Sequence, residues 1–273
     1  MQTFDVYGAT NTLPEPILDA IATRLEARGR HPALQQMLNE YLAAMEIDDA
    51  GSVLVVGSGT GVVPRFLAAR PAFAGAVVAI DQSPYLVDVA RRLAAEERVG
   101  DRIRFEVGDA QDLSEPDAAF DAVIAHTLIS HVGNPRAVLG EARRVVRPGG
   151  MVGIFDGDYA SLTFGQPDAI QGKRDDEAIQ AAMVAQPRVM RQMPALLREA
   201  ELTLMAGFPS VVADIGAADF FAPGLASFRR LLPQAGAMDA ATANAWVDAR
   251  LKESAEGAFF GASTFYAYLA RRG

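Results

Sequence analysis

The sequence has no cysteine among its 273 residues. Without a thiol the chain can form no disulfide, no thiolate zinc site and no cysteine nucleophile, and it cannot hold an iron–sulfur cluster through cysteine. Radical chemistry that depends on such a cluster is therefore excluded. Histidine is nearly as scarce, with three residues in the whole chain, so acid–base chemistry near neutral pH can draw on very few side chains.

Positive charge is also in short supply, since the chain has 25 Lys and Arg residues against 34 Asp and Glu residues and a net charge of −9. Binding to a phosphate backbone needs clustered cations, so we expect no nucleic acid partner. No stretch approaches eighteen consecutive apolar residues, and residues 1–5 show no basic region followed by an apolar run. We therefore expect no membrane partner and a cytoplasmic location.

Strands and helices are expected to alternate from residue 52 onward. Apolar and β-branched runs predict strands at 53–57, 76–81, 103–107, 120–126, 151–156, about 203–214 and 263–269, and helical periodicity predicts helices at 61–70, 84–98 and 135–147. Such alternation is typical of an α/β protein with helices on both faces of its sheet. The predicted fold class is thus α/β, with a doubly wound, mainly parallel, seven-stranded sheet.

Three helical stretches lie outside this alternation. Residues 14–46 have helical periodicity with a break at 29–32, and residues 168–200 and 217–257 are also helical in character. Long excursions between late strands usually lie over the ligand site at the carboxyl ends of the strands. We therefore expect three parts, listed in chain order: N-terminal helices that belong to a cap (1–50), a ligand-binding core (51–160), and late strands of the sheet with helical cap insertions (161–273).

A run of β-branched residues leads into three alternate glycines, Gly57, Gly59 and Gly61, and a second strand ends twenty residues later in Asp81. Glycines let the backbone turn and approach a ligand closely, and the following helix directs its N-terminus at that ligand. Asp81 can accept hydrogen bonds from the ribose hydroxyls of a nucleoside. A dinucleotide fold requires Gly-x-Gly-x-x-Gly, but Val62 stands at the third glycine position. The spacing favours S-adenosylmethionine over NAD, which disfavours a nicotinamide-dependent oxidoreductase.

Five sequence blocks follow one another in order: VLVVGSGTG (53–61), VVAIDQSP (77–84), FEVGDAQDL (105–113), FDAVIAHTLISHV (120–132) and LGEARRVVRPGG (139–150). Together they resemble the class I S-adenosylmethionine-dependent methyltransferases, particularly the small-molecule branch that includes the ubiquinone and menaquinone biosynthesis enzymes. The resemblance covers roughly residues 50–160 and none of the predicted cap. It implies a Rossmann-like fold with a helical cap, S-adenosylmethionine as cofactor with S-adenosylhomocysteine as product, and a small-molecule methyl acceptor.

The resemblance also assigns residues to the cofactor. The glycine loop would surround its methionine and ribose, Asp81 would bind the ribose hydroxyls, Gln82 would lie beside the adenine, and an aromatic residue before the first helix would fold across the cofactor as a lid. His126 would line the methionine portion. The full predicted set is Tyr7, Gly57, Ser58, Gly59, Gly61, Asp81, Gln82, Asp109, Ala110, His126 and Thr127. One departure is Val55, which stands where the family usually carries an acidic residue.

Catalysis needs little acid–base help, because a sulfonium leaving group already activates the methyl carbon and alignment supplies most of the acceleration. A base still assists an acceptor that starts protonated. The catalytic candidates are His131 and His126, which follow the fourth strand, and Asp156, which leaves the fifth strand with Asp158 close behind. Each has a structural alternative: capping for His131, cofactor lining for His126, and turn capping for the two carboxylates. We expect no metal, because no third ligand lies at a recognisable spacing.

The predicted cap contains two further groups of interest, each with two interpretations. An aromatic group could line an apolar acceptor pocket or pack a helix against the core, and an arginine group could hold an acidic substrate or form a solvated helix face. The aromatic group is Phe220, Phe221, Phe228 and Trp246, and the arginine group is Arg188, Arg191 and Arg198. The remaining histidine, His31, is expected to be a surface residue at a helix break.

The predicted function is S-adenosylmethionine-dependent methyl transfer to oxygen, nitrogen or carbon of a small organic acceptor, by in-line displacement. A non-enzymatic alternative is a catalytically degenerate methyltransferase fold that binds the cofactor or a partner without turnover. Val55 favours that alternative, whereas His126, His131 and Asp156 favour activity. The oligomeric state stays open, with a homodimer as one alternative.

Overall fold

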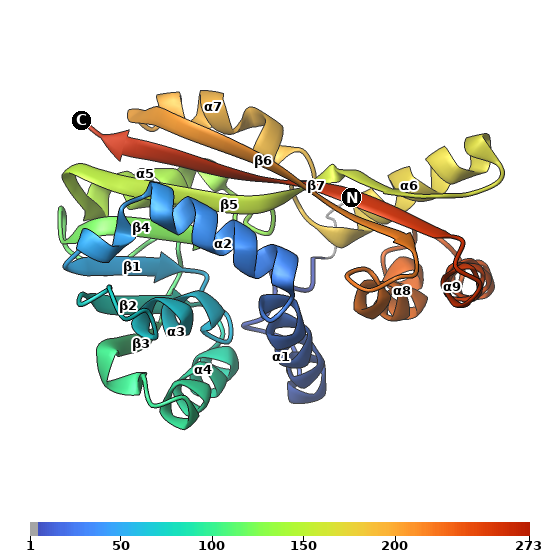
Figure 1. The fold of residues 1–273 in the computed structure, drawn as a ribbon, viewed down its shortest axis with the longest axis horizontal. Helices are drawn as coiled ribbons and strands as arrows, with labels where there is room; N and C mark the ends of the chain where they lie inside the picture. The colour runs from blue at the N-terminus through green and yellow to red at the C-terminus, as the bar shows by residue number, and fades with distance from the viewer. Residues whose placement is uncertain (1–4) are drawn as a thin grey trace.

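The computed structural model describes residues 5–273, which contain one seven-stranded sheet of order β3-β2-β1-β4-β5-β7-β6 (Figure 1). Strands β3, β2, β1, β4 and β5 pair in parallel, and β7 runs antiparallel to both of its neighbours. The predicted fold class is confirmed. The strands are β1 (Ser52–Val56), β2 (Ala76–Asp81), β3 (Ile103–Val107), β4 (Phe120–His126), β5 (Val146–Phe164), β6 (Leu202–Gly216) and β7 (Phe259–Arg272).

Helices precede, connect and follow these strands, close to the predicted positions. Pro32 begins the second helix, because proline fits the first turn of a helix. Pro187 lies between the sixth and seventh helices, because proline cannot continue a helix. The helices are α1 (Glu15–Gly29), α2 (Pro32–Ala44), α3 (Val62–Ala68), α4 (Pro84–Glu96), α5 (Pro135–Val145), α6 (Ala169–Met183), α7 (Val189–Glu199), α8 (Ala222–Gln234) and α9 (Ala240–Ala255), with short 3-10 helices η1 (Ile47–Asp49) and η2 (Gly100–Arg102).

Both faces of the parallel region are covered by helices. Along β1 the side chains alternate: Val53 and Val55 belong to the apolar layer formed with α2, α3 and α4, whereas Leu54 and Val56 belong to the layer formed with α5 and α7. A strand buried on both faces must be apolar at every position, which explains the unbroken valine and leucine run. Helices α2 and α7 therefore cover the sheet, although the sequence placed residues 14–46 and 168–200 in a cap.

The second halves of β5 and β6 and the first half of β7 extend past the parallel strands as an arm that carries α6, α8 and α9 (Figure 1). These helices form a separate apolar cluster with the end of the arm, where the rings of Phe164 and Trp246 lie 5.1 Å apart. Strand β5 bulges where it enters the arm. Asp158 pairs with Thr264 of β7 and Thr163 pairs with Ala262, so β5 advances five residues while β7 advances two. Bulges redirect side chains and are common beside active sites.

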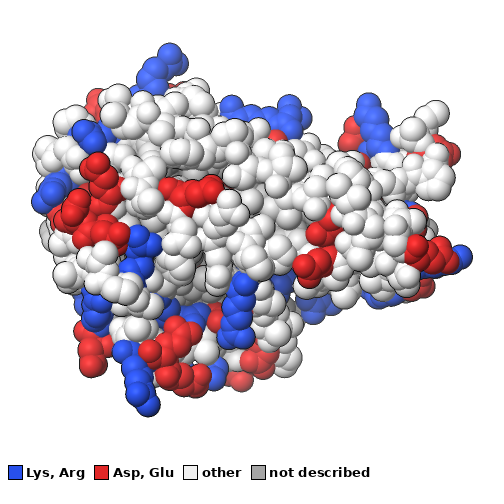
Figure 2. All heavy atoms as spheres, viewed as in Figure 1, with Lys and Arg blue, Asp and Glu red and all other residues white. Residues whose placement is uncertain are grey.

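The face of the molecule in Figure 2 carries basic and acidic side chains interspersed, without one continuous patch of either sign. No helix within residues 5–273 is long and apolar enough to cross a membrane. The expectation that the first residues carry no basic region followed by an apolar run was made from residues 1–5. Residues 1–4 lie outside the described part of the chain.

Candidate active site

The glycine loop lies at the carboxyl end of β1, and its glycines adopt left-handed backbone conformations. Gly57 has φ +64° and Gly61 has φ +81°, a region that side chains with a Cβ rarely adopt. A Cβ on Gly61 would lie 3.0 Å from the Phe105 ring and 3.1 Å from the Ala90 Cβ. Gly61 therefore permits close packing of the loop on β3 and α4, and it does not line the cavity described below, contrary to the prediction.

Asp81, at the end of β2, holds the glycine loop in place. One carboxylate oxygen accepts a hydrogen bond from the Gly59 amide (2.7 Å) and the other accepts one from the Ser83 amide (2.9 Å). Burial raises the pKa of Asp81, while these two hydrogen bonds oppose the rise. Each carboxylate oxygen has a second lone pair, so Asp81 can also accept from ribose hydroxyls. The sequence predicted only that ligand contact and not the contact with the loop.

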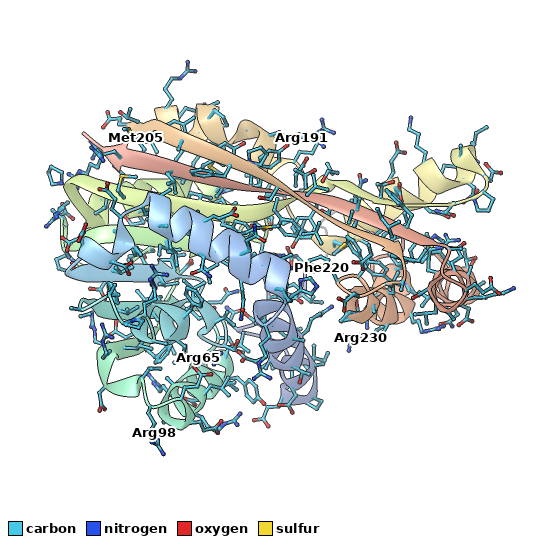
Figure 3. The ribbon with its side chains drawn as sticks, in the orientation of Figure 1. Arg65, Arg98, Arg191, Met205, Phe220 and Arg230 are labelled. Atoms are coloured by element: carbon cyan, nitrogen blue, oxygen red, sulfur yellow. The ribbon has the colours of Figure 1, made fainter. Side chains whose placement is uncertain are left out.

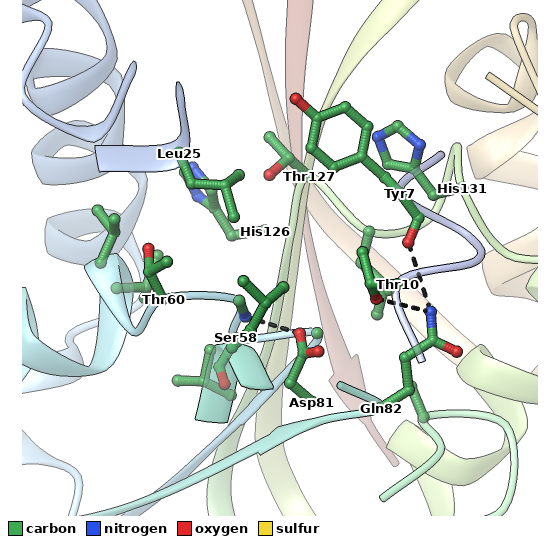
Figure 4. Close-up of a pocket in the computed structure, with 18 of the residues that line it drawn as sticks. Tyr7, Thr10, Leu25, Ser58, Thr60, Asp81, Gln82, His126, Thr127 and His131 are labelled. Carbon is green, nitrogen blue, oxygen red and sulfur yellow. Dashed lines mark hydrogen bonds between the residues drawn. The ribbon is translucent and has the colours of Figure 1, made fainter. Parts of the chain in front are cut away.

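A cavity of about 170 Å³ opens beside this loop, at the carboxyl ends of β1, β2, β3 and β4. Ten of the eleven predicted cofactor residues line it, and Figure 4 shows several of them converging on one space. The ten are Tyr7, Gly57, Ser58, Gly59, Asp81, Gln82, Asp109, Ala110, His126 and Thr127. Thr127 has a positive φ of +53°, an unusual conformation for a β-branched residue that is typical of functional sites.

The segment before α1 is tied across this cavity. The Gln82 side-chain amide lies within hydrogen-bond distance of the Gly8 carbonyl (3.1 Å), the Thr10 hydroxyl (3.3 Å) and the Tyr7 carbonyl (3.4 Å), as Figure 4 shows in part. Gln82 was predicted to lie beside the adenine. Its amide is instead engaged with the backbone and side chain of this segment, which places Tyr7 over the cavity.

His126 lines the cavity from the end of β4. Its Nδ1 lies 2.9 Å from the Tyr41 hydroxyl, and its ring stacks on Phe155 at 4.5 Å between centroids. Burial, and then the positive charge of Arg28, lower the pKa of His126 to about 3. A neutral imidazole with so low a pKa is a poor base at neutral pH. The predicted lining role fits these contacts, whereas the predicted catalytic role does not.

His131 makes a contact that no motif indicated. Its Nδ1 lies 3.0 Å from one oxygen of the Asp5 carboxylate and 3.1 Å from the other. Burial raises the pKa of Asp5, whereas contacts with His131 and with the amides of Gly8 and Ala185 lower it. The lowering contacts together outweigh burial, so the pKa of Asp5 lies below its usual value. A carboxylate on Nδ1 fixes the imidazole tautomer and leaves Nε2 to accept a proton. Both hydrogen bonds of the His131 ring among residues 5–273 involve Nδ1 and not Nε2.

Asp156 and Asp158 do not have the predicted access to a ligand. Asp156 is fully buried and accepts hydrogen bonds from the Ser130 amide (3.0 Å), the Ser130 hydroxyl (2.8 Å) and the Gly157 amide (2.8 Å). Asp158 is bonded to Arg191 at 2.8 Å. Neither is among the residues that line the first cavity or the adjoining second one, and the hydrogen bonds of Asp156 shape the turn before His131.

A second, largely apolar cavity of about 310 Å³ adjoins the first. Three residues, Tyr7, Arg28 and His131, line both cavities. Tyr159 and Leu162, from the bulged part of β5, line only the second. Of the predicted aromatic group, Phe220, Phe221 and Phe228 line it, whereas Trp246 packs in the arm cluster.

The predicted arginines do not reach this cavity, and two others do. Arg191 pairs with Asp158, and neither Arg188 nor Arg198 is among the lining residues. Arg24 and Arg28 of α1 line the second cavity instead. His31, expected at the surface, also lines it while its Nδ1 accepts the Ala33 amide at the start of α2. The sequence contained one signal for this pair, because Arg24 and Arg28 are four residues apart on a predicted helix. That spacing indicates only that the two side chains share a helix face and does not indicate a cavity.

The first cavity has the polar groups that S-adenosylmethionine requires. The hydroxyls of Ser58 and Thr60 are buried without a hydrogen-bond partner among residues 5–273, as expected where a polar ligand completes the loop. Asp81 fits the ribose. Arg28 brings a positive charge to the cavity wall, while Val55 lines the cavity without supplying the acid that the family usually has there.

Comparison with known proteins agrees with this geometry. Residues 53–150 match a methyltransferase domain model. A Streptomyces fradiae protein, an uncharacterized 37.1 kDa protein in transposon TN4556, is 30% identical over 256 residues, which cover 93% of this chain and 70% of that one. The ubiquinone biosynthesis O-methyltransferase of Xanthomonas oryzae is 36% identical over 120 residues, 43% of this chain and 48% of that enzyme. The match thus spans about half the enzyme's length.

Solved structures share the fold. A Bacillus halodurans protein crystallised as a candidate methyltransferase superposes with a TM-score of 0.61 at 18% identity, over 86% of this chain and 98% of that one. The cyclase SpnF superposes with a TM-score of 0.58 at 20% identity, over 89% of this chain and 84% of that one. The chain belongs to the class I S-adenosylmethionine-dependent methyltransferases.

Proposed function

We propose that this protein methylates a small organic molecule held in the second cavity, with S-adenosylmethionine held in the first. The observation that carries the proposal is that the two cavities meet at Tyr7, Arg28 and His131. Two ligands that approach each other at a shared wall gain the advantage of proximity and orientation that methyl transfer chiefly requires. When bound, the cofactor supplies a methyl group that is already activated by its sulfonium centre.

The chain's own residues have separable roles in this proposal. The glycine loop and Asp81 hold the ribose, Ser58 and Thr60 complete the polar contacts, and Arg28 holds the carboxylate end. Tyr7 covers the junction from the segment before α1. Asp109, Ala110, Gln82, His126 and Thr127 remain proposed lining residues.

His131 is the proposed general base. Asp5 orients its ring, and Nε2 can take the proton that the acceptor loses as it is methylated. The ring centroid also lies 5.0 Å from that of Tyr7, which lines both cavities, and 6.0 Å from that of Tyr159, which lines only the second. This arrangement suits an oxygen or nitrogen acceptor more than a carbon one, because those acceptors begin with a proton to lose.

A second candidate is a fold that binds the cofactor without methyl transfer. Val55, at the position where the family usually carries an acid, favours it, and the fold is shared with a protein named as a cyclase. Transfer of labelled methyl from S-adenosylmethionine to a panel of small phenols, amines and carboxylic acids separates the two. Labelled product that disappears with H131Q supports the first candidate. Binding of S-adenosylhomocysteine without any product supports the second.

Three broader predictions remain proposals. Residues 51–160 are proposed to form the cofactor core. Residues 1–50 are proposed to contribute to the cap through α1, and residues 161–273 to supply the late strands with α6, α8 and α9 as cap insertions, because α2 and α7 cover the sheet. The cytoplasmic location and a homodimer are likewise proposed, and sedimentation of the purified chain at several concentrations tests the homodimer.

A further inference from the structure

Two arginines face the second cavity without an acidic partner. Arg24 and Arg28 are four residues apart on α1, so they lie on one face of the helix and repel each other. No carboxylate of residues 5–273 lies within salt-bridge distance of either one. The acid of the same helix, Glu26, is engaged by Arg65 at 2.6 Å and by the exposed Arg30 at 3.7 Å.

Both guanidinium groups are also incompletely hydrogen-bonded. The Nε atoms of Arg24 and Arg28 are buried and have no partner in the described part of the chain. Each guanidinium lies against an aromatic ring instead, Arg24 at 5.2 Å from the Tyr7 centroid and Arg28 at 5.5 Å from the Phe265 centroid. Buried charged donors that lack acceptors are unfavourable, so a ligand that supplies oxygen acceptors is expected to bind there.

The two arginines differ in which cavity they can serve. Arg28 lines both cavities and is the proposed partner of the cofactor's carboxylate, whereas Arg24 lines only the second. Burial lowers the pKa of Arg28, whereas its neighbours Tyr159, Tyr7 and Asp156 raise it. The neighbours outweigh burial, so the pKa lies above its usual value and the guanidinium stays charged. Arg24 is therefore the cation that belongs to the acceptor site alone.

The rest of this cavity suits a flat apolar body. The Phe220 ring packs edge-on against His31 at 5.1 Å and against Phe265 at 6.0 Å, beside the junction of α1 and α2 (Figure 3). The Tyr159 ring also lines this cavity and lies edge-on to His131 at 6.0 Å between centroids. Aromatic walls of this kind bind aromatic rings by offset or edge-to-face contacts.

The rim limits the charge that the ligand can carry. Asp219 lines the mouth of the cavity and lies 3.8 Å from the His31 Nε2, with its side chain 89% exposed. A second negative charge on the ligand would meet this carboxylate. A planar carboxylate, in contrast, matches the fork of one guanidinium with two parallel hydrogen bonds.

We infer that the acceptor is an aromatic carboxylate that also carries the hydroxyl or amine to be methylated, bound with its ring between Phe220 and Tyr159 and its carboxylate on Arg24. The hydroxyl or amine loses its proton to His131 as it takes the methyl group from the sulfonium. The inference rests on the proposed function, because it names the ligand of the proposed acceptor cavity. It adds a specificity residue, Arg24, that the cofactor site does not use.

The test is titration calorimetry of the full chain saturated with S-adenosylhomocysteine, using four probes that share one ring system. They are 2-naphthoate, 2-naphthalenemethanol, 2-naphthylmethylamine and 2-naphthyl phosphate. We expect 2-naphthoate to bind at least tenfold more tightly than the alcohol and the amine. R24Q should remove that preference without changing the affinity for S-adenosylhomocysteine, and R24K should retain part of it. R30Q is the matched control, since Arg30 is the exposed residue that follows the last turn of the same helix, and the change should have no effect.

Three outcomes would overturn the inference while leaving the proposed function standing: equal binding of the acid and the alcohol, tighter binding of the phosphate, or no probe binding to a protein that binds S-adenosylhomocysteine. Equal effects of R24Q and R30Q would also overturn it. Failure of S-adenosylhomocysteine itself to bind would instead contradict the proposed function.

Discussion

Asp5 and His131 are 126 residues apart in sequence, yet the carboxylate of the first lies 3.0 Å from the Nδ1 of the second. The same Asp5 carboxylate accepts hydrogen bonds from the Tyr7 amide at 2.9 Å and the Ala185 amide at 2.9 Å. One side chain therefore orients the proposed base, positions the residue that covers the cavities, and joins both to the chain between α6 and α7. The proposed catalysis and the position of Tyr7 at the cavities therefore involve the same carboxylate.

Replacement of His131 by Gln should lower the rate of methyl transfer about a hundredfold or more for any oxygen or nitrogen acceptor, because the proton has no other receiver. D5N should cause a smaller loss, since the ring remains but its orientation is weakened. Steady-state kinetics with the acceptor found in the panel would measure both. The exposed Asp101, replaced by Asn, is the matched control. Unchanged kcat in H131Q would remove His131 from the proposed mechanism.

Replacement of Gly61 by Ala should destabilise the protein by about 2–4 kcal/mol, because alanine is strained at φ +81° and its Cβ would press on Phe105. Gly140 is the matched control: it lies in the exposed part of α5 with no atom within 4 Å of an added Cβ, and G140A should stabilise by about 0.5–1 kcal/mol. Urea unfolding of both variants gives these values. Equal stability of G61A and the parent chain would contradict the packing described for the loop.

The stability of the protein should fall in acid partly because of His126. Its pKa of about 3 in the folded protein lies below the usual value near 6.5. Between these two pH values the unfolded chain is protonated at His126 while the folded chain is not, so acid favours unfolding. This contribution is complete above pH 6.5 and is lost progressively toward pH 3. H126N keeps an acceptor for Tyr41 and should lose about 2 kcal/mol less than the parent between pH 6.5 and 4.5. Parallel pH profiles would show that His126 titrates normally.

Filling the second cavity should separate acceptor binding from cofactor binding. Ala182 lines that cavity and no part of the first, whereas its neighbour Ala181 is exposed on α6. A182F should abolish methyl transfer while leaving the affinity for S-adenosylhomocysteine within about twofold, because only the acceptor loses space. A181F should retain both. Normal transfer by A182F, measured with the same acceptor panel, would place the acceptor elsewhere.

Local patterns predicted the strands, turns and helix caps of residues 51–160 well. The glycine loop, the strand ending in Asp81 and the helix capped by Ser83 each depend on neighbours in sequence, and all three lie at one edge of the sheet because parallel strands end together. The Ser83 hydroxyl does accept the Leu86 amide, as its position before Pro84 predicts.

The acceptor half could not be predicted in the same way. The roles of Asp5, Arg24 and Arg28 depend on how α1 and the segment before it lie against the loop after β4 and the β5 bulge, and no local spacing encodes such contacts. Asp156 had the composition of a catalytic carboxylate, but its surroundings engage both of its oxygens. Residue type indicated the chemistry available, while tertiary packing decided which groups remained open to a ligand.

Binding of the cofactor is the most direct test of this account. Isothermal titration of the purified chain with S-adenosylmethionine and S-adenosylhomocysteine should give dissociation constants in the micromolar range, with no heat from NADH, and D81N should weaken both. Absence of binding, or binding of NADH in place of the other two, would contradict the assignment of the first cavity and the function proposed from it.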